Sequence, residues 1–328
     1  MTTLVTGGAG FIGSHMVHAL VDAGEQVIVI DNLSTGFEWA VPKGVPLVRG
    51  NVGDQALLQS LLAEHEVETI IHFAASTVVS ESVSTPLKYY LNNTVNSRSL
   101  IESAINGGVR NFIFSSTCAI YGSGPRVVVR EDSQPAPVSP YASSKLMSEI
   151  ILRDASAVSG LKHIILRYFN VAGADPLGRT GQSTKNATHL IKAAVETAVG
   201  KRPKIEVYGT DYNTADGTAV RDYIHVSDLV AAHFDALRYL RSGGQSTTLN
   251  CGYARGHSVL DVIDTVKRVS GIDFAVTFSG RRAGDLPAIV ADAGLIRSVL
   301  GWRPQFDDLD TIVRHALAWE RILPQRQV

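Results

Sequence analysis

A glycine-rich turn near the start of the chain is the feature that most restricts its fold. The turn reads GGAGFIG from Gly7 to Gly13, directly after the apolar run Leu4–Thr6 and at the start of the helical pattern Ile12–Ala23. Glycines at this spacing let the backbone approach a pyrophosphate, whose charge the N–H groups at a helix start can stabilise. A tight turn that binds nothing is the alternative for the glycines taken alone.

An acidic residue at the end of the next apolar run indicates which nucleotide such a turn would hold. Asp31 ends the run Val27–Asp31, close to the roughly 20-residue spacing at which a carboxylate reaches the hydroxyls of an adenine ribose. A 2′-phosphate would meet like charge there, and no Arg or Lys lies between Asp31 and Lys43. The sequence therefore favours NAD over NADP as cofactor.

Short apolar runs alternate with helical patterns through the first half of the chain, which predicts a doubly wound parallel sheet of the Rossmann type. The runs are apolar throughout, as expected for strands covered on both faces. After Ala174 the pattern loosens. We expect an α/β fold with an NAD-binding Rossmann domain, residues 1–174 plus 220–252, and a smaller, discontinuous α/β substrate-binding domain, residues 175–219 plus 253–328.

The helices and strands expected from these patterns can be stated by residue. In the first half, the expected strands are Leu4–Thr6, Val27–Asp31, Pro46–Val48, Thr69–Phe73, Asn111–Ser115 and His163–Phe169, and the expected helices are Ile12–Ala23, Asp54–Glu64, Leu87–Asn106 and Pro140–Ser159. In the second half we expect a helix near Ala187–Val199, strands Ile205–Tyr208 and Phe274–Phe278, and strands Asp222–Val226 and Thr248–Cys251 that rejoin the main sheet.

Charge and composition exclude several classes of partner. Lys plus Arg total 30 and Asp plus Glu total 31, so no excess of one sign indicates a nucleic-acid or anionic-membrane surface. We expect the first residues, which include no Lys or Arg, to form a buried strand and not a signal peptide, and no stretch approaches the roughly 18 apolar residues of a membrane span. Its two cysteines, Cys118 and Cys251, lack metal-type spacing and suit a reducing compartment, with a single disulfide between them as the alternative. We expect a cytoplasmic protein without a metal.

A Tyr and a Lys at helical spacing are the first candidate catalytic residues. Ser139 is placed to cap the helix Pro140–Ser159, and Tyr141 and Lys145 share one face of it. A phenol with a pKa near about 10 is a poor base, but a nearby ammonium and a positive nicotinamide favour the phenolate. Tyr141 is therefore a candidate general base for a sugar hydroxyl. An ordinary amphipathic helix is the alternative.

Three hydroxyl residues, Ser115, Ser116 and Thr117, end the fifth expected strand. Ligands of doubly wound sheets bind outside the carboxyl ends of the strands, so a hydroxyl here can bridge a substrate and Tyr141. Backbone capping is the alternative for the two serines. Cys118 follows them without a partnered His in the sequence, and we interpret it as a small filling residue.

These residues resemble the extended short-chain dehydrogenase/reductase family, and within it the nucleotide-sugar 4-epimerases, over nearly the whole chain. The cofactor-side motifs are TGGAGFIGSH from Thr6, DNL from Asp31, FAA from Phe73, NN from Asn92 and YFN from Tyr168. The motifs DGT from Asp216, VRDYIHV from Val220 and RRAGDLP from Arg281 are more specific to the epimerases.

The resemblance implies a role for each matched position. Thr117, Tyr141 and Lys145 form the catalytic group. The implied NAD contacts are Gly7, Gly10, Phe11, Ile12, Gly13, Asp31, Asn32, Asn51, Val52, Phe73, Ala74, Ala75, Asn93, Ser115, Tyr141, Lys145 and Tyr168. The implied UDP-sugar contacts are Thr117, Tyr141, Asn170, His189, Leu190, Arg221, Arg282, Asp285 and Ile289. Arginines suit a diphosphate and a carboxylate suits ribose hydroxyls, although surface ion pairs are the alternative for both arginines.

The sequence departs from the family pattern at three positions. Asn51 stands where the family often has Asp at the adenine, Thr77 where some members have Lys, and Lys192 where Pro is common. Ile289 lies at a position that gates the C2 substituent of the sugar in the resembling family. Its intermediate size predicts a preference for a 2-hydroxyl over a 2-N-acetyl group.

The implied reaction interconverts UDP-glucose and UDP-galactose. Tyr141 takes the proton from O4, hydride passes from C4 to NAD, and the 4-ketose turns its other face before both return. The resemblance also implies a C₂ homodimer through helices Leu87–Asn106 and Pro140–Ser159. A UDP-N-acetylhexosamine or UDP-pentose 4-epimerase and a non-catalytic NAD-sensing scaffold stay open. A 4,6-dehydratase is disfavoured because no carboxylate follows Thr117, and an NADP reductase because of Asp31.

Overall fold

A seven-stranded parallel sheet is the largest element of the computed structural model, which describes residues 1–122, 127–185, 187–282 and 285–326. The strand order is β3-β2-β1-β4-β5-β7-β11, and every neighbouring pair is parallel. The strands are β1 (Thr2–Thr6), β2 (Gln26–Asp31), β3 (Leu47–Arg49), β4 (Val67–His72), β5 (Asn111–Thr117), β7 (Lys162–Tyr168) and β11 (Thr247–Cys251). The chain winds outward from β1 to β3 and then from β4 to β11, which confirms the doubly wound fold.

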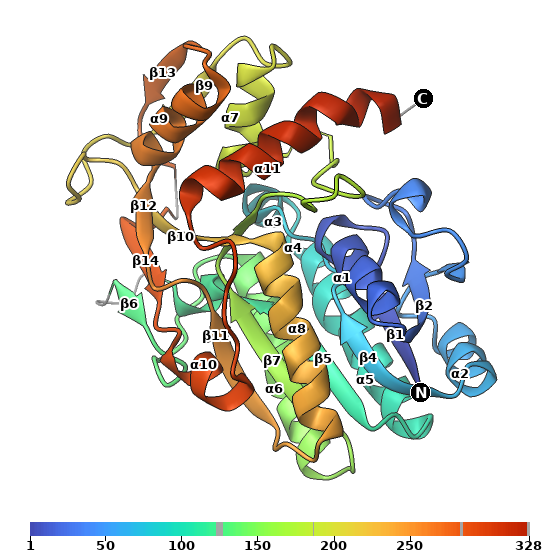
Figure 1. Ribbon diagram of the computed structural model, residues 1–328. Coiled ribbons are helices and arrows are strands. Elements are labelled where there is room, and N and C mark those ends of the chain that lie inside the picture. Colours follow the sequence, from blue (N-terminus) through green and yellow to red (C-terminus); the bar gives the residue numbers. More distant parts are fainter. Residues whose placement is uncertain (123–126, 186, 283–284, 327–328) are drawn as a thin grey trace.

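Helices cover both faces of this sheet. Helices α1 (Phe11–Asp22) and α8 (Val226–Arg241) pack together on one face, as Figure 1 shows. The other face carries α2 (Gln55–Glu64), α5 (Asn96–Asn106) and α6 (Pro140–Ala157), each in contact with the next. The helix that begins at Pro140 therefore ends two residues earlier than the sequence predicts.

Side chains of the central strands alternate between two hydrophobic cores. On β2, Val27 and Val29 join the core under α1 and α8, whereas Ile28 and Ile30 join the core under α2, α5 and α6. Each fully buried side chain of this kind contributes about 1.5–3 kcal/mol relative to an exposed one. Burial on both faces explains why the strands read as unbroken apolar runs.

The rest of the chain builds smaller sheets beyond the carboxyl ends of the main strands, along the upper and left sides of the molecule in Figure 1. One contains β12 (Gly256–Ser258), β10 (Val220–His225), β14 (Ala288–Ala291) and β6 (Val128–Val129), with β8 (Asn170–Ala172) paired to β10. A second pairs β9 (Ile205–Tyr208) with β13 (Val276–Ser279). The accompanying helices are α7 (Leu190–Ala198), α9 (Val259–Ser270), α10 (Gly294–Leu300) and α11 (Leu309–Ile322), and 3₁₀ turns lie at η1 (Glu38–Ala40), η3 (Cys118–Tyr121) and η4 (Leu323–Arg326).

One strand lies in a different sheet from the one that the sequence predicts. The predicted strand Asp222–Val226 corresponds to β10, which pairs with β8, β12 and β14 and not with the seven-stranded sheet. The prediction that it rejoins the main sheet is therefore wrong, whereas β11 does join it beside β7. Apolar content cannot distinguish these cases, because both strands are buried.

The predicted helix Leu87–Asn106 forms in three successive pieces after a short helix α3 (Val79–Ser84). They are α4 (Pro86–Tyr89), the π-helical turn η2 (Tyr90–Val95) and α5. A π-helical turn inserts one extra residue per turn, rotates the following side chains and is frequent at functional sites. Here it contains Asn93, one of the predicted cofactor residues.

Candidate active site

The glycine turn after β1 has a shape that side chains would block. Gly7 has a φ of +68°, and a Cβ on it would lie 2.7 Å from the backbone nitrogen of Ala74. A Cβ on Gly13 would lie 2.1 Å from the carbonyl oxygen of Gly7. Helix α1 starts at Gly10 without a side-chain cap or an acidic residue in its first turn. Its first N–H groups are thus available to an anion, and the turn fits a dinucleotide pyrophosphate.

Asp31 ends β2 beside this turn. Its carboxylate accepts hydrogen bonds from the backbone N–H groups of Ala9, at 3.0 Å, and Leu33, at 2.8 Å. Burial raises the pKa of Asp31, and these two hydrogen bonds oppose the rise. Each oxygen keeps a further lone pair, so the side chain can still accept from ribose hydroxyls.

The remaining cofactor candidates surround the ends of β2, β3 and β4. Phe11 and Ile12 form the first turn of α1 and are partly buried, Val52 is buried, Asn32 is exposed, and Phe73, Ala74 and Ala75 follow β4. The amide oxygen of Asn51 already accepts from the backbone of Gly53, at 2.8 Å, and from the side chain of Asn96, at 3.0 Å. The oxygen that we expect at the adenine amino group is therefore shared with two donors. Thr77 is exposed.

The π-helical turn directs Asn93 between the loop after β4 and the helix that carries Tyr141. Its side chain accepts from the Ser76 N–H at 2.8 Å and donates to the Ser76 carbonyl at 2.9 Å. It also donates to the Ser144 hydroxyl at 3.1 Å. Asn93 is buried and joins two walls of the cofactor site.

Tyr141, Lys145 and Thr117 meet at the carboxyl end of β5. The Ser139 side chain accepts from the Ala142 N–H, which confirms the predicted cap of α6. All three candidate side chains are buried, and Thr117 is close enough to the Tyr141 phenol to lower its pKa. The Lys145 ammonium lies 4.2 Å from the centre of the Phe114 ring. The structure therefore brings together the three residues expected to be catalytic.

Burial dominates the electrostatics of this group. It raises the pKa of Tyr141 to about 12, and the hydrogen bond from Thr117 opposes the rise. Burial also lowers the pKa of Lys145 to about 7, against the attraction of Glu149. The protein alone thus keeps the phenol neutral, and a further positive group beside it, such as an oxidised nicotinamide, is needed to favour the phenolate.

Ser115 and Tyr168 are a second pair of hydroxyl residues, on the adjacent strands β5 and β7. The Ser115 hydroxyl lies 2.7 Å from Nε2 of His233, whose Nδ1 lies 2.9 Å from the Leu229 carbonyl oxygen. Because a carbonyl only accepts, Nδ1 carries the proton and Nε2 accepts from Ser115. Sequence reasoning missed His233, since one His on an amphipathic helix carries no distinguishing signal.

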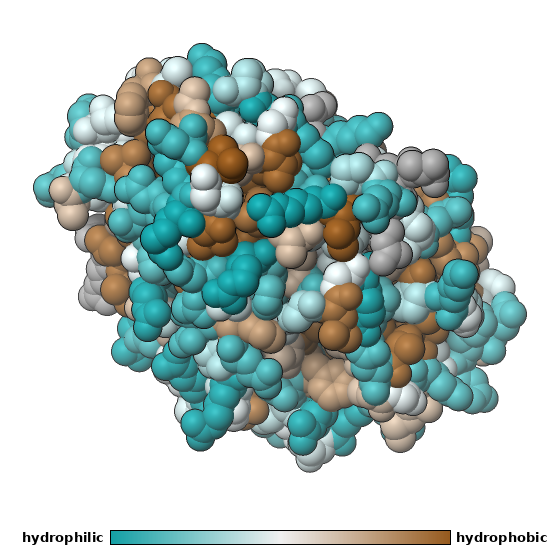
Figure 2. Space-filling view, turned by 45° about the horizontal axis from the view of Figure 1, so that its top comes forward, coloured by the Kyte–Doolittle hydropathy of each residue, from teal (hydrophilic) through white to brown (hydrophobic). Residues whose placement is uncertain are grey.

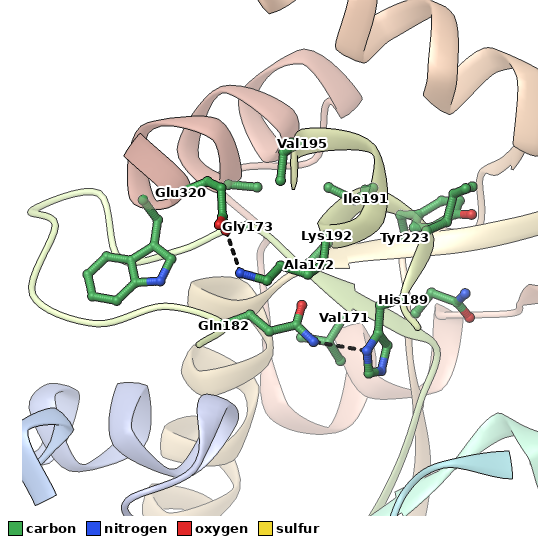
Figure 3. A pocket seen from close by; sticks show the side chains of 14 residues that line it. Val171, Ala172, Gly173, Gln182, His189, Ile191, Lys192, Val195, Tyr223 and Glu320 are labelled. Atoms are coloured by element: carbon green, nitrogen blue, oxygen red, sulfur yellow. Dashed lines mark hydrogen bonds and ion pairs between the residues drawn. The ribbon is translucent and has the colours of Figure 1, made fainter. Parts of the chain in front are cut away.

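A small pocket lies between α7, α11 and β8, and Figure 3 shows it from close by. Asn170, His189 and Leu190, three of the predicted substrate contacts, line it together. The side chain of Gln182 lies 2.9 Å from Nδ1 of His189, and a dashed line marks this contact in Figure 3. Gln182 is a further lining residue that sequence reasoning missed.

Lys192, the departure from the family pattern in α7, is buried beside this pocket. Its ammonium is paired with Glu320 of α11 and lies 3.4 Å from Glu196, one turn farther along α7. Lys201 also binds Glu320, at 2.6 Å. The lysine is thus neutralised by two carboxylates, and Figure 3 shows it turned toward Glu320.

The predicted diphosphate and ribose residues lie on β10 and on the segment before β14. Arg221 and Asp285 face each other at 3.8 Å. The Arg282 guanidinium lies 3.6 Å from the centre of the Tyr208 ring, and both Arg282 and Asp285 are exposed. Ala283 and Gly284 of the same predicted motif lie outside the described residues. The ring of Tyr208, at the end of β9, packs against Arg282 at this site. The sequence predicted Tyr208 only as the last residue of a strand.

Ile289 lies on β14, opposite Arg221 in the register of the parallel pair β10–β14. It is 4% exposed and packs in a hydrophobic cluster with Cys118, Phe169 and the neighbouring Ile120. Because Cys118 follows Thr117 directly, this cluster borders the catalytic group. The side chain is therefore both a core residue and a neighbour of the candidate site.

Three further findings concern the described residues. Both cysteines are buried and unpaired, and burial raises the pKa of Cys118 to about 12. No group of three His, Cys, Asp or Glu side chains among the described residues is arranged to hold a metal ion. In the same part of the chain, no helix is both long and apolar enough to cross a membrane.

Comparison with known proteins agrees with this geometry. Residues 3–252 match the model of the NAD dependent epimerase/dehydratase family. The chain belongs to this family. A UDP-glucose 4-epimerase of Azospirillum brasilense is 55% identical over 322 residues, which cover 98% of this chain and 92% of the relative. Membership of this family confirms the resemblance that the sequence motifs indicated. It also confirms that NAD is the cofactor of this epimerase.

Solved structures of similar proteins have the same fold as this chain. A UDP-glucose 4-epimerase of Brucella ovis in complex with NAD is 42% identical, with a TM-score of 0.94 and 97% of each chain covered. A UDP-Glc/GlcNAc 4-epimerase of Campylobacter jejuni is 46% identical, with a TM-score of 0.85, and the match covers 98% of this chain and 99% of that one.

Proposed function

We propose that this epimerase interconverts UDP-glucose and UDP-galactose by inverting C4 of the sugar. One observation carries the proposal: Thr117 and Tyr141 meet at the carboxyl end of β5, where Thr117 favours the Tyr141 phenolate, with the buried Lys145 on the same helix face. The name of the relative from Azospirillum brasilense supports the substrate. Bound NAD supplies the hydride acceptor and donor, so the reaction involves no net redox change.

Each catalytic residue has a separate task at O4. Tyr141 takes the O4 proton and later returns it, and Thr117 holds that proton in position through its hydroxyl. Lys145 supplies positive charge that favours the phenolate, which burial alone disfavours. Because all three side chains are buried, water is excluded from the reacting atoms.

The nucleotide is held away from the reacting carbon. Arg221 and Arg282 are placed to bind the diphosphate, and Asp285 can accept from ribose hydroxyls. Binding energy on these remote groups leaves the hexose free to present either face to the cofactor. The same residues serve a UDP-N-acetylhexosamine or a UDP-pentose equally well.

The name of the Campylobacter jejuni relative favours UDP-N-acetylglucosamine as a second substrate. Ile289 opposes it, because its buried, β-branched side chain borders the catalytic group and cannot easily turn aside. A 4,6-dehydratase is disfavoured because Cys118, which follows Thr117, is a neutral thiol whose pKa burial raises to about 12. It cannot replace an acid–base carboxylate.

The function is tested with purified protein and four substrates: UDP-glucose, UDP-galactose and their N-acetyl analogues. We expect NMR spectra of the products to show rapid interconversion of the first pair and slow conversion of the second. Absence of turnover on every sugar, with NAD bound, would favour the non-catalytic scaffold. Denatured protein should release NAD(H), and release of NADP would contradict the assignment from Asp31.

We also propose a homodimer. The face formed by Leu87, Leu91 and Val95 has side chains that are 80%, 58% and 50% exposed, although all three are apolar and four residues apart. Met147 and Ile150 are exposed on the adjacent α6. A second copy of this pair of helices would cover both stripes in a four-helix bundle. Light scattering should give a dimer at micromolar protein, and Leu91→Glu should give a monomer.

The cellular setting and the division of the chain are proposed as well. Two buried free thiols suit a reducing cytoplasm. On the face drawn in Figure 2, hydrophobic residues lie in small groups separated by hydrophilic ones, which supports a protein without a membrane partner. We propose that residues 1–174 and 220–252 hold NAD while residues 175–219 and 253–328 hold the UDP-sugar.

A further inference from the structure

A buried ion pair lies directly beneath the catalytic group. Glu149 of α6 is 0% exposed, and its carboxylate accepts three hydrogen bonds from Arg167 of β7, at 2.7, 3.1 and 3.2 Å. The same carboxylate accepts from the Ser116 hydroxyl of β5 at 2.5 Å. Glu149 therefore joins one helix to two adjacent strands of the main sheet.

The remaining polar atoms around this pair are also satisfied. Arg167 donates to the Tyr121 hydroxyl at 3.0 Å and to the Glu131 carbonyl at 3.2 Å. Tyr121 donates in turn to the Asn250 side chain at 2.7 Å. A buried network in which every member has a partner holds one geometry rigidly, because any shift leaves a buried charge unpaired.

This network lies next to all three catalytic residues. Ser116 precedes Thr117 on β5, so the bond to Glu149 sets where that strand ends. Lys145 lies one helical turn before Glu149 and Tyr141 lies two turns before it, on the same face of α6. The separation of Thr117, at the end of β5, and Tyr141, at the start of α6, thus depends on how closely α6 is held to β5.

We infer that Glu149 is a positioning residue for the proposed reaction: it ties α6 to β5 through Ser116, and its pairing with Arg167 sets the net charge that Lys145 meets. The inference rests on the proposed function. It adds that Glu149 holds Thr117 and Tyr141 at their separation and sets the charge near Lys145. Glu149 does not touch the reacting atoms itself.

The charges around Glu149 and Arg167 predict the direction in which the Lys145 titration should shift in each variant. Glu149 also faces Arg153, at 3.6 Å on α6, and interacts with His163 of β7. Lys145 faces the Phe114 ring of β5 and interacts with His72 of β4, which burial keeps neutral because it lowers the His72 pKa to about 3. Glu149 is the acidic group that supports the charge of Lys145.

Opposite shifts are therefore expected when the two partners are removed in turn. Glu149→Gln leaves Arg167 uncompensated, so Lys145 should lose its proton at a lower pH. Arg167→Met removes the positive charge that offsets Glu149, so Lys145 meets more negative surroundings and should hold its proton to a higher pH. Each shift should be about one pH unit, the order expected for a unit charge one helical turn away.

Two readouts separate this inference from the proposed function. Carbon-13 NMR of enzyme labelled at lysine Cε follows the titration of Lys145, which is identified by the signal lost in Lys145→Met, and needs no substrate. The alkaline limb of kcat with UDP-galactose should move in the same directions. If the two variants shift the Lys145 titration in opposite directions but the unmutated protein shows no turnover, the proposed function is refuted and the inference about Glu149 is supported.

Ser116→Ala tests the tether without changing any charge and removes only one hydroxyl. We expect kcat to fall about tenfold with the Lys145 titration unmoved and KM nearly constant. In the double variant Ser116→Ala/Thr117→Val, the further loss of kcat caused by Thr117→Val should be smaller than the loss that Thr117→Val causes alone, because both changes act on one contact. Ser116→Ala still tests the inference if Arg167→Met or Glu149→Gln does not fold.

Asp228→Asn is the matched control for loss of a buried carboxylate. Asp228 is buried at the start of α8 and accepts from Tyr253 and from the backbone of Gln305 and Phe306. This variant should lower the melting temperature and leave the Lys145 titration unchanged. The inference is overturned if the Glu149 and Arg167 variants shift Lys145 in the same direction or not at all, or if Ser116→Ala leaves kcat unchanged.

Discussion

The cofactor side and the nucleotide-sugar side of the site are built in different ways. Asp31 on β2, Asn93 in the π-helical turn η2 and Lys145 on α6 are all buried in elements of the main sheet and its covering helices. Arg282 and Asp285 lie exposed on a loop between two short sheets. The first group therefore has its geometry before any ligand binds, whereas the side chains of the second group are open to solvent.

This contrast matches the two ligands in the proposed function. NAD returns to its starting state in each cycle and never needs to leave, so a rigid, buried site suits it. The UDP-sugar must enter, turn and leave, which requires groups on accessible loops. The predictions below test whether chemistry belongs to the rigid side and affinity to the exposed side.

The largest effect is expected on the rigid side. Tyr141→Phe removes the general base and should lower kcat by 10²- to 10⁴-fold, with nearly unchanged nucleotide binding. Steady-state kinetics with UDP-galactose and measurement of bound NAD test both parts. Turnover close to that of the unmutated protein would remove Tyr141 from the mechanism.

Lys145→Met should separate function from stability on the same side. Turnover should fall about 100-fold, because the phenolate loses its charged neighbour. The cofactor-free variant should nevertheless be more stable near pH 7, by roughly 3–5 kcal/mol, since burial lowers the Lys145 pKa to about 7 from about 10.4 in the unfolded chain. Thermal unfolding at several pH values tests this expectation.

The sign of that pH dependence follows from proton counting. Between about pH 7 and pH 10 the unfolded chain binds the Lys145 proton and the folded protein does not, so stability rises with pH in this window. The unmutated protein should therefore approach the stability of Lys145→Met as the pH rises toward 10. A difference between the two that stays constant over this range would contradict the buried, depressed pKa.

Much of the rigid side could be predicted from the sequence, because local patterns specify it. The turn at Gly7 needs glycine for steric reasons, and the spacing of Tyr141 and Lys145 determines their common face. The π-helical turn at Asn93 and the buried partner His233 could not be predicted. Both depend on tertiary contacts that leave no periodic signal.

The exposed side was harder to predict, because its residues are far apart in the sequence. β10 pairs with β14 across more than 60 residues, and this register alone brings Arg221 beside Ile289. Without it, β10 was expected in the main sheet. The ring of Tyr208 meets Arg282 only in the folded chain.

An intermediate effect is expected on the exposed side. Arg282→Ala should raise KM for UDP-galactose by about 10- to 100-fold and change kcat by less than about threefold, because a charge-assisted bond to a diphosphate forms in both ground and transition states. Arg281→Ala is the matched control, since that side chain binds Asp211 at 2.7 Å and lies over Tyr212. A loss of kcat in Arg282→Ala with unchanged KM would reverse the proposed division of tasks.

The smallest effect concerns the residue where the two sides meet. Ile289 is buried against Cys118, beside the catalytic group, yet lies on β14 of the substrate side. An N-acetyl group adds three heavy atoms over a hydroxyl, and small misfits in a pocket change specificity by about 10- to 200-fold. The unmutated enzyme should therefore prefer UDP-glucose and UDP-galactose over UDP-N-acetylglucosamine.

Substitution at this position should move the preference in both directions. Ile289→Gly makes room and should raise the ratio of kcat/KM for UDP-N-acetylglucosamine to that for UDP-glucose by about tenfold, whereas Ile289→Tyr should abolish the N-acetyl activity. A ratio measured on one preparation is insensitive to partial unfolding, which a buried Ile→Gly change promotes. Val290→Ala, whose side chain points to the opposite side of β14, should lower stability and leave the ratio unchanged. Equal kcat/KM for the two sugars in the unmutated enzyme, or a ratio indifferent to both changes at Ile289, would reduce this residue to core packing.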